Sequence, residues 1–176
     1  VFRPADPVET AECWQLALER LKGPTVLALS RQNLTPVRTT TDAANRCAEG
    51  GYELVAANGE AKVAIFASGS EVEIAVAAQK QLAERSIAAR VVSVPSLELL
   101  LAQPADKRAT IIGNAPVKIA VEAQVRFGWD AVIGADGTFI GMHDFGHSAP
   151  AKDLYKHFGI TADAVVEAAA KRLQGK

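Results

Sequence analysis

KVAIFASGSEVEIAVAAQKQLAERSIAARVVSV, residues 62–94, contains two apolar runs separated by a helical pattern. Lys62–Ala67 is a short apolar run, which is typical of a buried strand. Ser70–Arg85 repeats apolar residues at helical spacing and opens with a serine that can cap it and a glutamate three residues later. Arg90–Val94 is again apolar. Two strands joined through a helix run parallel, so this stretch predicts a parallel sheet covered by helices.

The rest of the C-terminal region extends this pattern. Tyr52–Ala56 reads as a strand, and the turn at Asn58-Gly59 predicts that it pairs antiparallel with Lys62–Ala67. We therefore expect an α/β fold, a three-layer α/β/α domain whose mixed sheet is mostly parallel with an antiparallel first strand. The further elements are strands at Val117–Val121 and Thr138–Gly141, helical turns at Leu97–Ala102 and Asp106–Ile111, and helices at Pro150–Phe158 and Ala162–Leu173, capped by Ser148 and Thr161.

The N-terminal region predicts one helix and one strand. Asp6 can cap a helix that Pro7 opens and that Gly23-Pro24 ends. The apolar run Thr25–Leu29 then reads as a buried strand. Asn33–Gly51 turns polar and includes Thr39-Thr40-Thr41, which indicates a surface connection. We place a domain boundary near Gly50, giving a first part of residues 1–50 and a second of residues 51–176.

Composition excludes several classes of function. The chain has 176 residues, with 19 Lys+Arg against 20 Asp+Glu, so the net charge of −1 argues against nucleic acid as a partner. No window approaches the ~18 apolar residues of a membrane span. Two cysteines, Cys13 and Cys47, form no disulfide framework and favour a reducing compartment, the cytoplasm. Met142 is the sole methionine, so we expect Val1 to lie within a longer protein or to result from processing.

Arg31 is the strongest candidate for binding chemistry. It follows the predicted strand Thr25–Leu29, and ligands of parallel sheets bind beyond the carboxyl ends of strands. A guanidinium there can hold a phosphate through two charge-assisted hydrogen bonds. The alternative is an arginine that simply closes a strand in solvent.

Three further motifs have simpler structural explanations. The turn Ala67–Glu71 offers amides to an anion, but it lacks the glycine spacing of nucleotide-binding loops. His143, Asp144 and His147 could ligate a metal, yet they lie in a loop without a further strong ligand. A triad of Ser148, His147 and Asp153 lacks the strand–elbow–helix pattern of hydrolases. We therefore expect no catalytic residue, no cofactor-binding residue and no metal ligand in this chain.

Several segments together resemble the C-terminal part of the transketolase family, and they cover nearly the whole chain in order. The Leu-Ser-Arg-Gln-Asn and Phe-Gly-x-Ser-Ala-Pro-Ala strings are the most specific of them. The segments are Arg3-Pro4-Ala5-Asp6 with Glu9, Gly23-Pro24-Thr25, Leu29-Ser30-Arg31-Gln32-Asn33-Leu34, Gly50-Gly51-Tyr52, Ala67-Ser68-Gly69-Ser70-Glu71-Val72, Arg90–Ser96, Phe145-Gly146-His147-Ser148-Ala149-Pro150-Ala151 and His157–Thr161.

The resemblance implies a thiamine-diphosphate transferase that moves a two-carbon ketol unit from a ketose phosphate to an aldose phosphate. It implies a homodimer, with thiamine diphosphate and Mg²⁺ or Ca²⁺ in the full-length enzyme. Residues 1–50 would end the pyrimidine-binding domain, and residues 51–176 would form the C-terminal domain. Arg31 matches the arginine that binds the substrate's phosphate. The same transfer serves the pentose phosphate pathway and the Calvin cycle.

Departures from the family pattern bear on the fragment itself. The Gly-Asp-Gly and Asn-Asn motif that holds metal and diphosphate is absent, as is the glutamate that activates the cofactor. We therefore expect this chain alone to bind no cofactor and to be inactive. We also expect residues 1–50 to be poorly protected without the remaining strands of their sheet, whereas residues 51–176 close their own core. The alternative is a stand-alone non-catalytic α/β module that binds a phosphorylated ligand or a partner subunit; deoxyxylulose-phosphate synthase fits the C-terminal strings less well.

Overall fold

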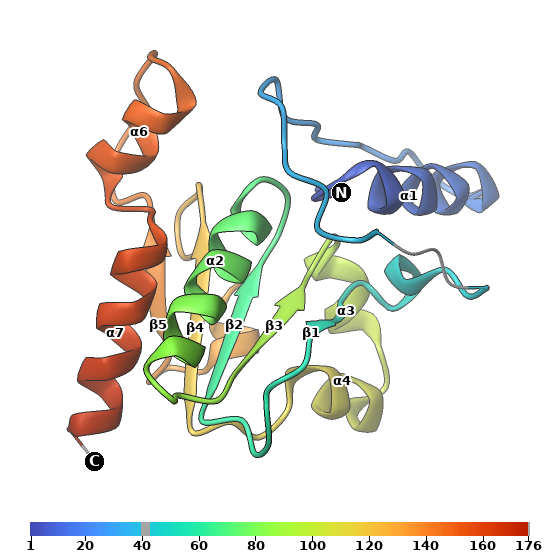
Figure 1. The fold of residues 1–176 in the computed structure, drawn as a ribbon. Helices are drawn as coiled ribbons and strands as arrows, with labels where there is room; N and C mark the ends of the chain where they lie inside the picture. The colour runs from blue at the N-terminus through green and yellow to red at the C-terminus, as the bar shows by residue number, and fades with distance from the viewer. Residues whose placement is uncertain (40–42, 176) are drawn as a thin grey trace.

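A computed structural model describes residues 1–39 and 43–175. Within these residues, five strands form one sheet in the order β1-β3-β2-β4-β5 (Figure 1). The strands are β1 (Tyr52–Val55), β2 (Val63–Ala67), β3 (Ala89–Ser93), β4 (Val117–Glu122) and β5 (Thr138–Gly141). The helices are α1 (Pro7–Glu19), the short 3₁₀ helix η1 (Arg46–Glu49), α2 (Glu71–Glu84), α3 (Leu97–Ala102), α4 (Ala105–Ile112), α5 (Asp130–Ile133), α6 (Ala151–Phe158) and α7 (Ala162–Gln174).

Helices cover both faces of the sheet, as the sequence predicts. Side chains of β2 alternate between the faces because successive residues of a strand point in opposite directions. Val63 and Ile65 pack with α2 and α7, where Leu82 and Val165 are buried. The opposite face is closed by α3, α4 and α5, whose buried residues Leu100, Ile111, Val132 and Ile133 pack with Ala64 and Phe66. The three-layer α/β/α architecture is confirmed.

The predicted pairing of the first strand is half right. Strand β1 is antiparallel, but its partner is β3, with Tyr52 opposite Ser93, and not β2. Strand β2 is the central strand: Val63 lies opposite Ala89 of β3 and Val117 of β4, both in parallel register. Both edges of β2 are therefore occupied, and β1 can join the sheet only at the free edge of β3.

The N-terminal region keeps its helix but not its strand. Asp6 caps α1 by accepting a hydrogen bond from the amide of Glu9 at 2.9 Å. The apolar run Thr25–Leu29 is not a buried strand, because in the described chain it forms one isolated parallel bridge, between Phe2 and Leu27. Val26 and Leu29 are more than half exposed. A single-residue partner cannot supply the run of paired backbone groups that defines a strand.

The polar connection contains structure that the sequence does not predict. Helix η1 lies within it and buries Cys47 against Cys13 and Phe2. Gly50 follows η1 at a φ of 81°, and a Cβ there would lie 2.1 Å from the Leu100 amide nitrogen. Thr40 and Thr41 of the threonine run lie outside the described residues.

The predicted helix caps differ in outcome. Thr161 caps α7 by accepting from the amide of Ala164 at 3.2 Å, which confirms the prediction. Ser70 occupies the N-cap position of α2, but its hydroxyl bonds to the carboxylate of Glu71 at 2.8 Å instead of capping the helix. Ser148 does not cap α6, because Pro150 holds the N-cap position and Ser148 is exposed two residues earlier.

Candidate functional site

Arg31 lies in a segment that runs beside the start of the chain. The extended residues before it are fixed by two hydrogen bonds of 2.8 Å, from the Phe2 amide to the Val26 carbonyl and from the Ala28 amide to the Phe2 carbonyl. Arg31 itself is exposed, and within residues 1–39 and 43–175 its guanidinium has no ion-pair partner. The guanidinium is therefore available to an anion.

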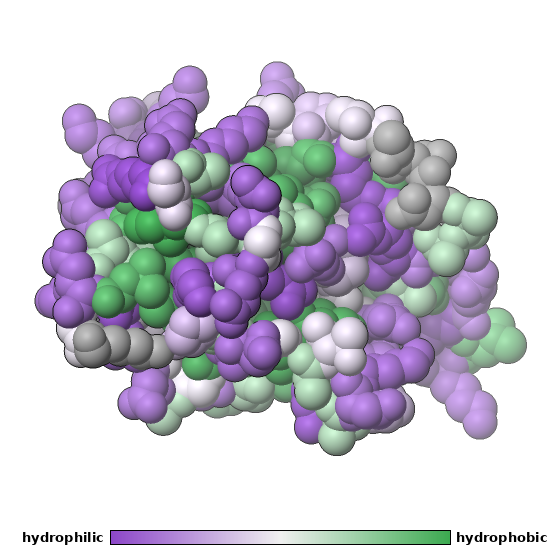
Figure 2. All heavy atoms as spheres, turned by 60° about the horizontal axis from the view of Figure 1, so that its bottom comes forward, coloured by the Kyte–Doolittle hydropathy of each residue, from purple (hydrophilic) through white to green (hydrophobic). Residues whose placement is uncertain are grey.

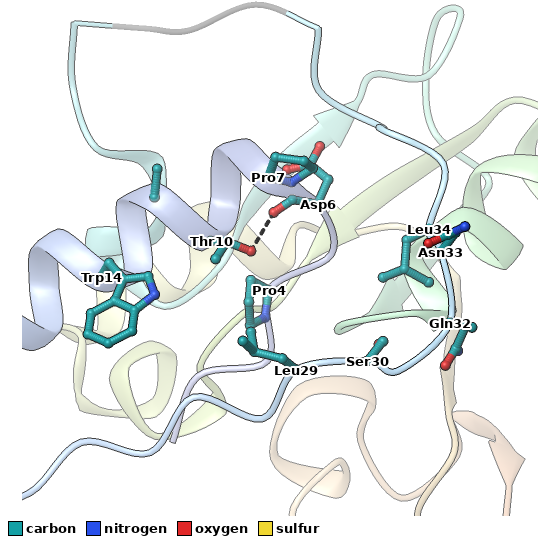
Figure 3. A pocket seen from close by; sticks show the side chains of 11 residues that line it. Pro4, Asp6, Pro7, Thr10, Trp14, Leu29, Ser30, Gln32, Asn33 and Leu34 are labelled. Atoms are coloured by element: carbon teal, nitrogen blue, oxygen red, sulfur yellow. Dashed lines mark hydrogen bonds between the residues drawn. The ribbon is translucent and has the colours of Figure 1, made fainter.

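The residues on both sides of Arg31 line an open groove of 620 Å³ (Figure 3). One wall consists of α1 and the residues before it, and the other is the segment that carries Arg31. The lining includes both polar and apolar side chains. The lining residues are Pro4, Asp6, Pro7, Thr10, Ala11 and Trp14, and across from them Leu29, Ser30, Gln32, Asn33 and Leu34.

A second polar cluster lies at the carboxyl ends of β2 and β4. The Arg3 guanidinium donates to the Ser68 hydroxyl at 3.0 Å and pairs with the carboxylates of Glu71 at 3.3 Å and Glu122 at 2.5 Å. Both glutamates are fully buried. Tyr155 of α6 donates to Glu71. The cluster joins residues from the beginning, middle and end of the chain.

This cluster occupies the topological switch point of the sheet. The chain leaves β2 toward α2 on one face and leaves β4 toward α5 on the other. Adjacent strands whose connections diverge in this way open the crevice where doubly wound proteins bind their ligands. Here the Arg3 guanidinium contacts both Ser68 and Glu122, which are themselves joined by a hydrogen bond from the Ser68 hydroxyl.

Burial sets the protonation of the acidic residues in the cluster. Burial, together with the negative charge of Glu71, raises the pKa of Glu122 well above its usual range. The positive charge of Arg3 and the hydrogen bond from Ser68 offset only part of this effect. Burial and the charge of Glu71 also raise the pKa of Tyr155. Burial therefore favours the protonated, neutral forms of Glu122 and Tyr155.

Glu9 forms a similar junction without a cation. Its carboxylate accepts from the hydroxyls of Tyr52 and Ser93, both at 2.6 Å, and from the amide of Ala5 at 2.7 Å. Burial raises the pKa of Glu9, and these three hydrogen bonds lower it by less. Glu9 thereby links α1 to β1 and β3 of the sheet.

The other candidate motifs are not brought into reactive arrangements. In the turn after β2, the amides of Gly69, Glu71 and Val72 bond to carbonyls of the chain, so they are already satisfied. In the exposed loop before α6, Asp144 accepts from the amide of Phe145 at 2.7 Å. His147 stacks on Phe158 at 5.6 Å between ring centroids.

The histidine loop offers neither a metal site nor a triad within the described residues. No group of three or more His, Cys, Asp or Glu side chains there is placed to hold a metal ion. Ser148, His147 and Asp153 are exposed, and no hydrogen bond links them in the described part of the chain. The structure thus brings together Arg3, Glu71 and Glu122, which sequence spacing did not indicate. Within the described residues it does not assemble the side chains of the histidine loop into a site.

Comparison with known proteins agrees with this fold. The family model described as "Transketolase-like TK C-terminal domain" matches residues 50–161. The chain belongs to the transketolase family. It is 54% identical to a transketolase from Sinorhizobium medicae over 175 residues, 99% of this chain and 25% of that protein. It is 51% identical to a transketolase from Cereibacter sphaeroides over 98% of this chain and 26% of that protein.

Solved structures of the transketolase family share the arrangement. A transketolase from Leishmania mexicana superposes with a TM-score of 0.88 at 39% identity, covering 98% of this chain and 25% of that one. A chain described as a split gene transketolase, inactive beta4 tetramer, superposes with a TM-score of 0.74 at 25% identity and is covered to 57%. The chain thus spans about a quarter of the length of its curated relatives.

The transketolase family implies thiamine diphosphate and a divalent metal in full-length enzymes. The carboxyl groups that meet in the described residues, Glu71 and Glu122, are already bound by Arg3, Ser68 and Tyr155, so their oxygens do not form an open site for a metal. Among residues 1–39 and 43–175, no helix is long and apolar enough to cross a membrane.

Proposed function

We propose that the chain is the C-terminal part of a transketolase that transfers a two-carbon ketol unit from a ketose phosphate to an aldose phosphate. The identity of 54% over 99% of the chain carries this proposal. The proposed boundary at Gly50 separates the end of the pyrimidine-binding domain, residues 1–50, from the C-terminal domain, residues 51–176. The complete enzyme would act in the cytoplasm as a homodimer with thiamine diphosphate and Mg²⁺ or Ca²⁺ held by residues outside this chain. The chain alone would be inactive.

Arg31 would bind the phosphate of the sugar substrates. Its exposed guanidinium is free of ion pairs in the described chain, and its sequence neighbours Ser30 and Gln32 line the groove. A planar guanidinium matches phosphate oxygens through paired hydrogen bonds, which a lysine cannot reproduce. The side chain would anchor the substrate at its phosphate end and leave the reacting carbon to groups elsewhere in the enzyme.

Substitution of Arg31 in the complete enzyme tests this role. We expect Arg31→Ala to raise KM for ribose 5-phosphate about 10- to 100-fold, the size expected for loss of a charged hydrogen-bonded contact. KM for ribose, which lacks the phosphate, should stay within about twofold of the parent value. Arg85→Ala is the matched control, because Arg85 is also an exposed arginine but lies at the C-terminal end of α2. Equal losses with both sugars would reject the assignment.

A separate-subunit arrangement is the second candidate. A chain described as a split gene transketolase, of which this chain covers 57%, favours this candidate, in which the chain belongs to a subunit of partial length. The two arrangements differ in the mass of the native polypeptide. Intact mass spectrometry of the source protein decides between a long chain and a subunit of partial length.

A further inference from the structure

Asp6 lies where the start of α1 meets the end of the segment that carries Arg31. We propose that Asp6 is a positioning residue for Arg31: its carboxylate fixes this segment and thereby sets the position of the Arg31 backbone, whose neighbours Ser30 and Gln32 line the groove. The inference rests on the proposed role of Arg31 in binding phosphate. Asp6 itself would not touch the phosphate, since two negative charges repel each other.

The two oxygens of the Asp6 carboxylate accept hydrogen bonds from different parts of the chain. Oδ1 accepts the Glu9 amide at 2.9 Å and caps α1. Oδ2 accepts the amides of Val37 at 3.1 Å and Arg38 at 2.7 Å. Asp6 is 4% exposed, so these bonds are shielded from water. One buried side chain thus ties residues 37 and 38 to the N-terminus of α1.

The segment between residues 28 and 38 is therefore held at both ends. The Phe2 backbone fixes its beginning and Asp6 fixes its end. Between these points it has no helix or strand, and the Thr35 amide donates to the exposed carboxylate of Glu73 at 3.1 Å. Figure 3 shows the segment from Leu29 to Leu34 curving around the groove opposite Pro4 and Asp6. Loss of the hydrogen bonds from the Val37 and Arg38 amides to Asp6 would let the segment move away from α1.

A carboxylate is suited to this position because both of its oxygens accept. Serine is a good helix cap, so Asp6→Ser preserves the bond to the Glu9 amide. Serine has a single short hydroxyl, however, and cannot also accept from Val37 and Arg38. Asn in the same place offers one accepting oxygen and a donating NH₂ group, which leaves these amides unsatisfied without changing side-chain size. The two substitutions therefore separate helix capping from control of the segment.

The test measures kinetics of the complete enzyme with ribose 5-phosphate and with ribose. We expect Asp6→Ser and Asp6→Asn each to raise KM for ribose 5-phosphate about tenfold, as expected when a charged contact is weakened, and to leave KM for ribose within about twofold. In an Arg31→Ala background, the same substitutions should add no further loss, because a residue that acts through another is not additive with it. Thr161→Ala is the control: it removes an equivalent cap from α7 and should lower Tm without changing either KM.

The kinetic results distinguish failure of the Arg31 proposal from failure of the inference about Asp6. If Arg31→Ala affects ribose and ribose 5-phosphate alike, the proposed phosphate site fails and the inference fails with it. If Arg31→Ala is selective for the phosphorylated sugar but the Asp6 substitutions are not, or if their effects add to that of Arg31→Ala, the inference about Asp6 is wrong and the role of Arg31 stands. If Asp6→Ser does not fold, the isosteric Asp6→Asn decides by the same two criteria.

Discussion

Glu9 and Glu122 are carboxyl groups with no contact with water, but their surroundings differ. Glu122 faces the guanidinium of Arg3, whereas the carboxylate of Glu9 receives two hydroxyls and one amide. Burial raises the pKa of both above the usual 4.5. The folded state therefore binds protons more strongly than the unfolded chain at these two positions.

The sign of the resulting pH effect follows from this difference. A raised pKa contributes stability that is fully present below pH 4.5 and is lost as the pH rises through the folded value. We expect Glu9→Gln, which preserves the shape of the side chain, to reduce the fall in the free energy of unfolding between about pH 5 and 8. Urea denaturation at several pH values measures this fall. Glu84→Gln, at an exposed position of α2, should leave it unchanged. A Glu9→Gln protein with the parental pH slope would contradict the assignment.

Sequence spacing does not predict the partners of Arg3. Nor does Arg31 lie beyond the end of a strand as expected, because Thr25–Leu29 forms one isolated bridge in the described chain, so the phosphate-binding role of Arg31 stays a prediction. Arg3, Glu71 and Glu122 are far apart in the chain and meet because of the order of strands in the sheet. A glutamate at the end of an apolar strand is the one local signal for Glu122, since a charged group in such a run needs a buried partner.

Helix ends show the same division between local and long-range information. Thr161 is followed directly by helical residues and caps α7. Ser148 is separated from α6 by Ala149 and Pro150, and the fixed φ of proline moves the helix start beyond the reach of its hydroxyl. A capping residue is therefore recognised by its distance from the first helical turn as well as by its type.

These two residues give a paired prediction for stability. Thr161→Ala should lower the free energy of unfolding by about 1 kcal/mol, because the amide of Ala164 loses its acceptor. Ser148→Ala should change it by less than about 0.5 kcal/mol, as is usual for an exposed residue without a structural role. Thermal or urea unfolding of both variants measures the difference. Equal losses would mean that the cap of α7 contributes nothing beyond surface effects.

Which strands pair depends on which strand edges are already occupied by others, and no single segment of the sequence reveals this. The periodicity of Lys62–Ala67 and Arg90–Val94 predicts two neighbouring parallel strands, and β2 and β3 confirm it. The hairpin expected from Asn58-Gly59 does not form, because β4 takes the edge of β2 that it would require. The run Thr25–Leu29 fails for the opposite reason, since too few partners for it lie in the described chain.

Several exposed apolar side chains lie on α1 and the segment after it. Trp14, Leu18, Leu21, Val26 and Leu29 are each at least half exposed, as are Val1, Val125, Phe127 and Phe145 elsewhere in the described chain. On the face seen in Figure 2, hydrophobic residues are interspersed with hydrophilic ones. Patches of this kind usually contact another part of a protein. The proposed complete enzyme would cover these residues with the portion that this chain does not contain.

The contacts across Gly50 predict how the second part behaves alone. Residues 51–176 should fold, because both faces of their sheet are covered by their own helices. They should be less stable at neutral pH than residues 1–176, because Glu71 and Glu122 lose the cation of Arg3. The deficit should shrink as the pH falls and Glu122, whose pKa is raised by burial, is protonated. Urea denaturation of both polypeptides between about pH 5 and 8 measures it. Equal stability throughout would show that the Arg3 contacts contribute little.

The position of Arg3 has a consequence for ligand access to the sheet. A small molecule that bound at the carboxyl ends of β2 and β4 would first have to displace the Arg3 guanidinium from two carboxyl groups and a hydroxyl. Its displacement would leave Glu71 and Glu122 without their cation, whereas Glu9 would still link α1 to β1 and β3. The end of the sheet where doubly wound proteins bind their ligands is therefore closed here by a residue from the start of the chain.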